Sequence, residues 1–112
     1  MIDEIFALSA HIRYVALYRD GHLTSRQKAE VADASSSESD RYEELFVNPA
    51  LLTLATQRGT LDCGGLDYLL IRYGHFFQFV FAQPWGHVSV CIDAEADAIG
   101  IGTRVRAWVA RA

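Results

Sequence analysis

The sequence has little of what a secreted, membrane-spanning or nucleic-acid-binding protein needs. Its two cysteines, Cys63 and Cys91, are too few for a disulfide framework and fit a reducing compartment. No run of about 18 apolar residues would cross a bilayer, and the opening Met-Ile-Asp-Glu is acidic where a secretory signal is basic. Ten basic against fourteen acidic side chains give a net charge of −4, which opposes binding to phosphate backbones and anionic membranes. We therefore expect a cytoplasmic protein that binds neither nucleic acid nor membrane.

Motifs for metal, nucleotide and nucleophile chemistry are absent or incomplete. The histidines and cysteines form no Cys-x-x-Cys or His-x-x-x-His pair, and we expect the four histidines at the surface or in turns. Neither a Gly-x-Ser-x-Gly elbow nor a complete dinucleotide fingerprint occurs, because Val105 stands where the third glycine would follow Gly100 and Gly102. Glu43 and Glu44 are adjacent, so on a helix they point about 100° apart. We expect no catalytic residue, no metal and no cofactor.

What the chain does contain is enough apolar material for a core. Of its 112 residues, 51% are hydrophobic and 12% are aromatic. A chain of this size can bury roughly two thirds of its unfolded surface, which suffices for folding without disulfides or metal. We therefore expect a single domain over residues 1–112.

Turn and helix signals predict the order of the elements. Asp20-Gly21 suits a type I′ turn between two strands. Asn48-Pro49 predicts a helix start with Asn48 as N-cap, and Gly59 predicts its end. The polar residues 26–40 predict a mobile loop or a weak helix. The expected elements are a helix near residues 2–6, strands at 12–19 and from 23, a helix at 49–58, strands at 66–73, 76–83 and 87–92, and a helix at 101–109.

Alternation along the later strands predicts a buried sheet face. Phe77, Phe79 and Phe81 fall on one side of their strand, and in the next strand Val88, Val90 and Ile92 oppose His87, Ser89 and Cys91. The helix at 49–58 carries an apolar stripe that includes Leu54, so we expect it to lie on the sheet. The fold class is therefore α/β of the α+β type, a five-stranded antiparallel sheet with helices packed on it.

Three stretches resemble the roadblock/dynein light chain family: the hairpin Tyr18-Arg19-Asp20-Gly21-His22-Leu23 after a short helix, the three-stranded meander, and the segment from Gly86 to Gly100 before the last helix. The resemblance covers nearly the whole chain. It implies a profilin-like three-layer sandwich and a homodimer. It also implies, as a partner, a Ras-like small GTPase that the protein regulates or scaffolds.

Two short segments are candidates for contact with a partner or ligand. Asp62-Cys63-Gly64-Gly65 places a thiol beside two residues that can turn backbone N–H groups toward an anion. A thiol-using or ligand-sensing domain centred on this loop is the alternative to an interaction module, although a flexible connection with a half-buried cysteine explains the loop as well. Trp85 lies at the tip of a hairpin, where it either faces a partner or folds back on the sheet end.

The strand at residues 66–73 is the candidate dimer interface, because the topology implied by the family places it at a sheet edge. It is apolar on both faces and carries no proline or lysine to protect it. A two-fold axis perpendicular to the sheet and passing through Leu70 sets Tyr68 opposite Arg72 and Leu69 opposite Ile71. We expect this strand to pair with its own copy.

Overall fold

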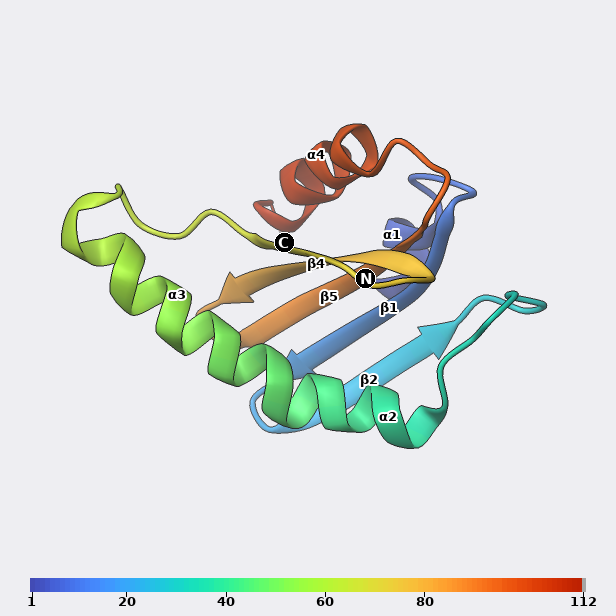
Figure 1. Cartoon of the computed structure of the whole chain (residues 1–112), viewed down its shortest axis with the longest axis horizontal. Coiled ribbons are helices and arrows are strands. Elements are labelled where there is room, and N and C mark those ends of the chain that lie inside the picture. The colour runs from blue at the N-terminus through green and yellow to red at the C-terminus, as the bar shows by residue number, and fades with distance from the viewer. Residues whose placement is uncertain (112) are drawn as a thin grey trace.

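The computed structural model describes residues 1–111 and confirms the five-stranded antiparallel sheet with helices on both faces (Figure 1). The strand order is β2-β1-β5-β4-β3, so β2 and β3 are the two edges. No helix within residues 1–111 is both long enough and apolar enough to span a bilayer. The elements are α1 (Ile2–Phe6), β1 (Ile12–Arg19), β2 (His22–Gln27), α2 (Ser37–Tyr42), the π-helical turn η1 (Glu43–Val47), α3 (Asn48–Asp62), β3 (Leu69–Arg72), β4 (Phe76–Gln83), β5 (Gly86–Asp93) and α4 (Ala98–Val109).

The turn between β1 and β2 has the predicted geometry. Asp20 and Gly21 both have positive φ, 50° and 84°, as a type I′ turn requires. The ladder that follows pairs Arg19 with His22 and Tyr14 with Gln27. The turn thus fixes the register of β1 against β2, and β2 forms the sheet edge opposite β3.

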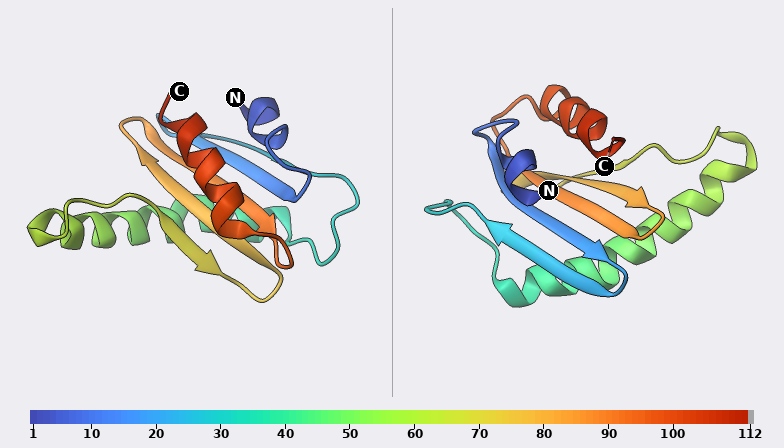
Figure 2. Two further views of the ribbon diagram at one scale, coloured as in Figure 1. Left: turned by 90° about the horizontal axis from the view of Figure 1, so that it is seen from above. Right: turned by 180° about the vertical axis from the view of Figure 1, so that it is seen from behind.

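One face of the sheet holds the apolar core, and α1 and α4 cover it (Figure 2). The predicted alternation is confirmed, since Phe79, Phe81, Val88, Val90 and Ile92 are all buried in this layer. Gly102 of α4 packs directly on the sheet. A Cβ on Gly102 would lie 2.2 Å from Cζ of Phe79, so only glycine allows the helix to approach the ring this closely.

The other face is crossed by one continuous helical segment, Ser37 to Asp62. The expectation was a mobile loop or a weak helix up to residue 40 and a separate, shorter helix at 49–58. Asn48 is not an N-cap: its backbone is helical, and its N–H donates to the carbonyl of Glu43, five residues earlier. Ser36 caps the segment instead, its side chain accepting from the N–H of Ser39. Pro49 has no N–H to donate, and the π turn directly before it accommodates the missing bond.

Gly59 lies inside α3 and does not end it. A Cβ at this position would lie 2.9 Å from the carbonyl carbon of Gly65, so the glycine allows the returning chain to pass close to the helix. The N–H groups of Cys63 and Gly65 both donate to the Gly59 carbonyl and close the helix end. The prediction that the helix ends at Gly59 is therefore wrong, because the glycine is required by a tertiary contact and not by a helix stop.

Candidate functional site

The open edge of the sheet and the outer surface of α3 form the main candidate interaction surface. β3 covers only Leu69–Arg72, shorter than the expected 66–73, and pairs on one side with β4. The N–H of Tyr73 donates to the carbonyl of Phe76, which makes this a hydrogen-bonded pair of the hairpin. Hydrogen-bonded and non-hydrogen-bonded pairs alternate along an antiparallel ladder, so Leu70 and Phe79 form a non-hydrogen-bonded pair. The backbone N–H and C=O of Leu70 therefore point away from β4, to the open side.

The helix α3 is poorly covered by its own chain. Only Asn48, Leu52 and Gly59 of its 15 residues are buried. Leu54 is 65% exposed and Leu61 is 78% exposed, and their spacing of seven residues places both on one helix face. The expectation that Leu54 is buried against the sheet is therefore wrong, because the sheet is covered by the first turns of the segment while α3 continues past the β4 and β3 side (Figure 2).

The side chains of the expected dimer strand are partly engaged within the chain. The ring of Tyr68 packs on Phe79, with centroids 5.2 Å apart, and the guanidinium of Arg72 lies 4.8 Å from the ring centroid of Phe77. Leu69 and Ile71 are half-buried on the face that α3 crosses, and Leu70 is exposed on the opposite face. A Tyr68–Arg72 contact between copies would therefore have to replace these partners, whereas a Leu69–Ile71 contact replaces none.

The loop Asp62-Cys63-Gly64-Gly65 lies exposed at the end of α3. The thiol of Cys63 donates to Oδ1 of Asp62 at 3.3 Å, and Arg58 pairs with the same carboxylate oxygen at 2.5 Å. The Arg58 guanidinium, followed by the thiol, holds the pKa of Asp62 below its usual value. Because the N–H of Gly65 is already bonded to Gly59, it is not free for an anion. The thiol-using role of this loop stays a prediction.

Trp85 folds back on the sheet end. Its side chain is half-buried against the apolar core, and the guanidinium of Arg19 lies 4.2 Å from its ring centroid. The carbonyl of Trp85 accepts from the N–H of Asp20 at 2.8 Å, which joins the tips of the two hairpins. Its role in contacting a partner stays a prediction.

The sequence reasoning missed a buried polar network between η1 and the sheet. Glu44 is fully buried, and His87, expected at the surface, is 2% exposed. Oε1 of Glu44 lies 2.8 Å from Nε2 of His87 and accepts from Nδ2 of Asn48 at 2.8 Å, and its Oε2 accepts from the hydroxyl of Tyr14 at 3.1 Å. The one signal in the sequence was a set of polar residues inside strands that are covered on both faces.

Cys91 lies on the same face of the sheet. It is buried, whereas Cys63 is exposed in its loop, and both are free thiols. Burial, followed by the nearby carboxylates of Glu44 and Asp40, raises the pKa of the Cys91 thiol well above its ordinary value. The thiol therefore stays protonated and acts as a small apolar side chain of the core.

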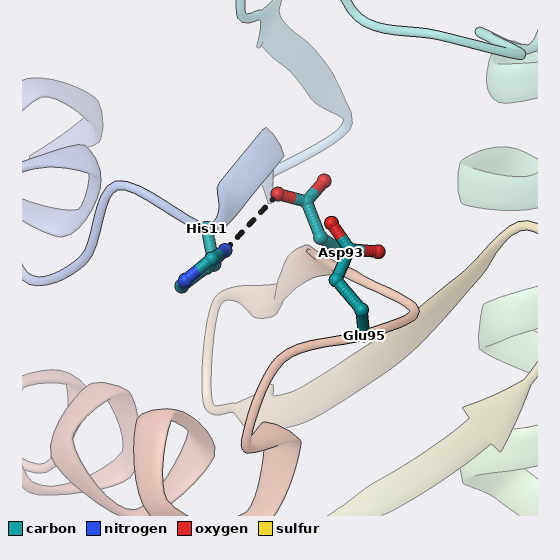
Figure 3. A group of neighbouring side chains, drawn as sticks. All are labelled: His11, Asp93 and Glu95. Carbon is teal, nitrogen blue, oxygen red and sulfur yellow. Dashed lines mark hydrogen bonds and ion pairs between the residues drawn. The ribbon is translucent and has the colours of Figure 1, made fainter.

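One cluster has the composition of a metal site, at the end of the sheet near α1 (Figure 3). A ring nitrogen of His11 and carboxylate oxygens of Asp93 and Glu95 lie within 4.8 Å of one another. Nδ1 of His11 is 3.4 Å from Oδ2 of Asp93, and a guanidinium nitrogen of Arg13 is 3.6 Å from Oδ1 of the same residue. The positive charge of Arg13, already beside the Asp93 carboxylate, would repel a divalent metal ion bound there. We therefore interpret the cluster as ion pairing of Asp93, at the end of β5, with His11 and Arg13 at the start of β1.

No protein-family model and no curated protein matches the chain.

Proposed function

We propose that the chain is a homodimeric interaction module of the cytoplasm that regulates or scaffolds a Ras-like small GTPase. The observation that supports it is the combination of an open strand edge at β3 with the exposed side chains of Leu54 and Leu61 on α3. Monomeric proteins normally protect unpaired strand edges, because such edges attract other chains. The GTPase as partner follows from the resemblance to the roadblock/dynein light chain family.

A two-fold axis perpendicular to the sheet at Leu70 uses both features together. The N–H and C=O of Leu70 point to the open edge, so each copy of Leu70 donates to and accepts from the other. The same axis sets Leu69 opposite Ile71 on the face that α3 crosses. Because such an axis preserves the faces of the sheet, the two α3 helices lie on one side and run antiparallel. Their exposed faces, with Leu54 and Leu61, then come next to one another.

The oligomeric state is tested by light scattering after gel filtration, at tens of micromolar protein. We expect a particle of twice the 12.5 kDa chain mass. Leu70→Pro removes the donor at the axis, and Leu54→Asp places a charge in the helix contact, so both variants become monomeric with wild-type circular dichroism. Thr53→Asp, which introduces the same charge at the neighbouring exposed position, stays dimeric. A wild-type monomer, or a Leu54→Asp dimer, contradicts the proposal.

The partner class is tested with the purified dimer as bait for proteins of its source cell, followed by mass spectrometry. We expect a small GTPase among the retained proteins, and a change in its GTP hydrolysis or nucleotide exchange rate when the purified proteins are combined. Leu70→Pro is the control that separates binding by the dimer from binding by the single domain. Absence of any GTPase from the retained proteins would contradict the assignment of the partner and leave the dimer unaffected.

A further inference from the structure

A cavity of about 370 Å³ lies between the α2–η1 segment and the sheet face beneath it. Its floor includes Tyr14, Phe76, Gln78 and Cys91 from three strands, and its roof comes from α2 and η1. Small-molecule sites in proteins commonly measure about 300–1,000 Å³, so the cavity has the size of a site for a small ligand. It is separate from the β3 edge and from the exposed face of α3.

Four aromatic side chains line this cavity: Tyr14, Tyr42, Tyr73 and Phe76. The rings of Tyr73 and Phe76 meet edge to face with centroids 5.5 Å apart, and Tyr42 stands at the exposed rim. The faces of aromatic rings carry negative potential and attract cations, which is how aromatic cages bind quaternary and other ammonium groups. This lining favours a ligand that is flat or apolar and carries positive charge.

Three carboxylates, those of Asp40, Glu43 and Glu44, line the same cavity. No lysine or arginine in the part of the chain described pairs with any of them, and the cavity lining contains neither residue type. Burial raises the pKa of Asp40 and of Glu43, and repulsion from Glu44 adds to the increase in both. Glu44 lies 2.8 Å from His87, whereas Asp40 and Glu43 have no cationic partner within the described residues. Their carboxylates disfavour phosphates, nucleotides and other anions in the cavity.

Gln78 provides an independent observation at the floor. It is 2% exposed and lines the cavity, and its Nε2 donates to the hydroxyl of Ser89 at 2.6 Å. Its Oε1 has no hydrogen-bond partner among residues 1–111. A buried acceptor without a donor is uncommon in folded proteins and destabilising. A ligand with N–H groups supplies the donor that the chain does not.

We propose that this cavity binds a small organic cation: an amine or guanidine with an aromatic or apolar body. The body packs among the aromatic side chains, the charged group lies between the carboxylates of Asp40 and Glu43, and an N–H donates to Oε1 of Gln78. A bare metal ion fits less well. Within residues 1–111 the only three ligand side chains that converge closely enough to hold one are His11, Asp93 and Glu95, which lie outside this cavity.

The test uses three probes of nearly equal size: 2-phenylethylammonium, the neutral 2-phenylethanol and the anion 3-phenylpropionate. Binding to the full chain is followed by ¹H–¹⁵N correlation spectra. We expect saturable binding of the ammonium with a Kd of about 1 mM, as is usual for so small a ligand, with shifts around α2, Tyr73 and Gln78. The alcohol should bind at least about tenfold more weakly and the carboxylate not measurably.

Variants separate this site from general attraction of a cation to an acidic protein. Asp40→Asn together with Glu43→Gln should weaken ammonium binding about tenfold or more. Glu38→Gln removes the same type of charge from the exposed part of α2 outside the cavity and should leave the Kd unchanged. Equal affinity for the ammonium and the alcohol, or an equal effect of Glu38→Gln, would overturn the proposal. So would the absence of saturable ammonium binding up to about 10 mM.

Discussion

Removal of the Glu44 carboxylate should be among the most damaging single changes in this protein. The carboxylate accepts hydrogen bonds from Asn48 and Tyr14 and lies 2.8 Å from Nε2 of His87, all in a region that water does not reach. Glu44→Ala leaves three buried polar groups without their partner. Each unsatisfied group costs about 1–3 kcal/mol, and breaking a buried ion pair typically costs about 3–5 kcal/mol in total. Because the Tyr14 hydroxyl can rotate toward another partner, we expect the total loss of stability to be about 3–5 kcal/mol.

The expected loss is a large part of the about 5–15 kcal/mol that holds a domain together. For a chain of this size it lowers Tm by about 10–25 °C, measured by circular dichroism. The protein concentration is kept fixed, because the Tm of any protein that self-associates depends on concentration. Glu43→Ala is the matched control. The only hydrogen-bond donor to the Glu43 carboxylate within the described residues is the hydroxyl of Tyr73, at the protein surface. Glu43→Ala should therefore lower the free energy of unfolding by about 1 kcal/mol or less.

Two further variants distinguish the charge from the hydrogen bonds. Glu44→Gln keeps an acceptor for Asn48, and the Tyr14 hydroxyl can turn to accept from the new amide, so this variant should lose about 1–2 kcal/mol. Adding His87→Ala to Glu44→Ala should cost less than the sum of the single changes, because the two side chains share one interaction. If Glu44→Ala is no worse than Glu43→Ala, the reasoning about the buried network is refuted.

Three other predictions follow from the packing and from the acidic groups. Gly102→Ala forces a Cβ to within 2.2 Å of the buried Phe79 ring and should lower stability by about 1–3 kcal/mol in urea denaturation, against the usual gain of alanine in a helix; an unchanged midpoint would contradict this. Under native conditions Cys63 should react with a thiol reagent while Cys91 reacts only on unfolding, and non-reducing electrophoresis should show no bridge within the chain. Because burial raises the pKa of Glu43, the folded state favours its protonated form, a contribution to stability that is lost as pH rises through the raised pKa. Glu43→Gln should therefore gain in Tm relative to wild type between pH 4 and pH 7, and a constant difference would argue against it.

The sheet could be predicted because its signals are local. Asp20-Gly21 dictates a turn through the backbone angles of two residues, and the alternation in β4 and β5 follows from the pleat alone. The long helix could not be predicted in the same way. Asn48-Pro49 and Gly59 are common helix boundary signals, but here a π turn accommodates the first and a contact with Gly65 explains the second. Both explanations depend on neighbours that local patterns do not specify.

The candidate site was harder to predict for the same reason. The polar residues in the strands were visible, but their common partner, Glu44, lies 43 residues before His87 and 30 residues after Tyr14. The open edge at β3 was expected, since strand order follows from the implied topology. The exposure of Leu54 and Leu61 on α3 was not expected. Apolar residues at helical spacing give the same sequence pattern whether they pack on their own sheet or on another chain.

The π turn connects the shape of the helix to the chemistry beneath it. In a regular helix Glu43 and Glu44 would differ by about 100°, and a π turn changes that angle and shifts every side chain before Pro49 relative to those after it. Glu44 then reaches inward to His87, while Glu43 lines the cavity and accepts from Tyr73. Asn48, four residues after Glu44, donates to its carboxylate, and Leu54 beyond it is exposed. The π turn before Pro49 thus carries both Glu44 of the buried network and Glu43 of the acidic cavity.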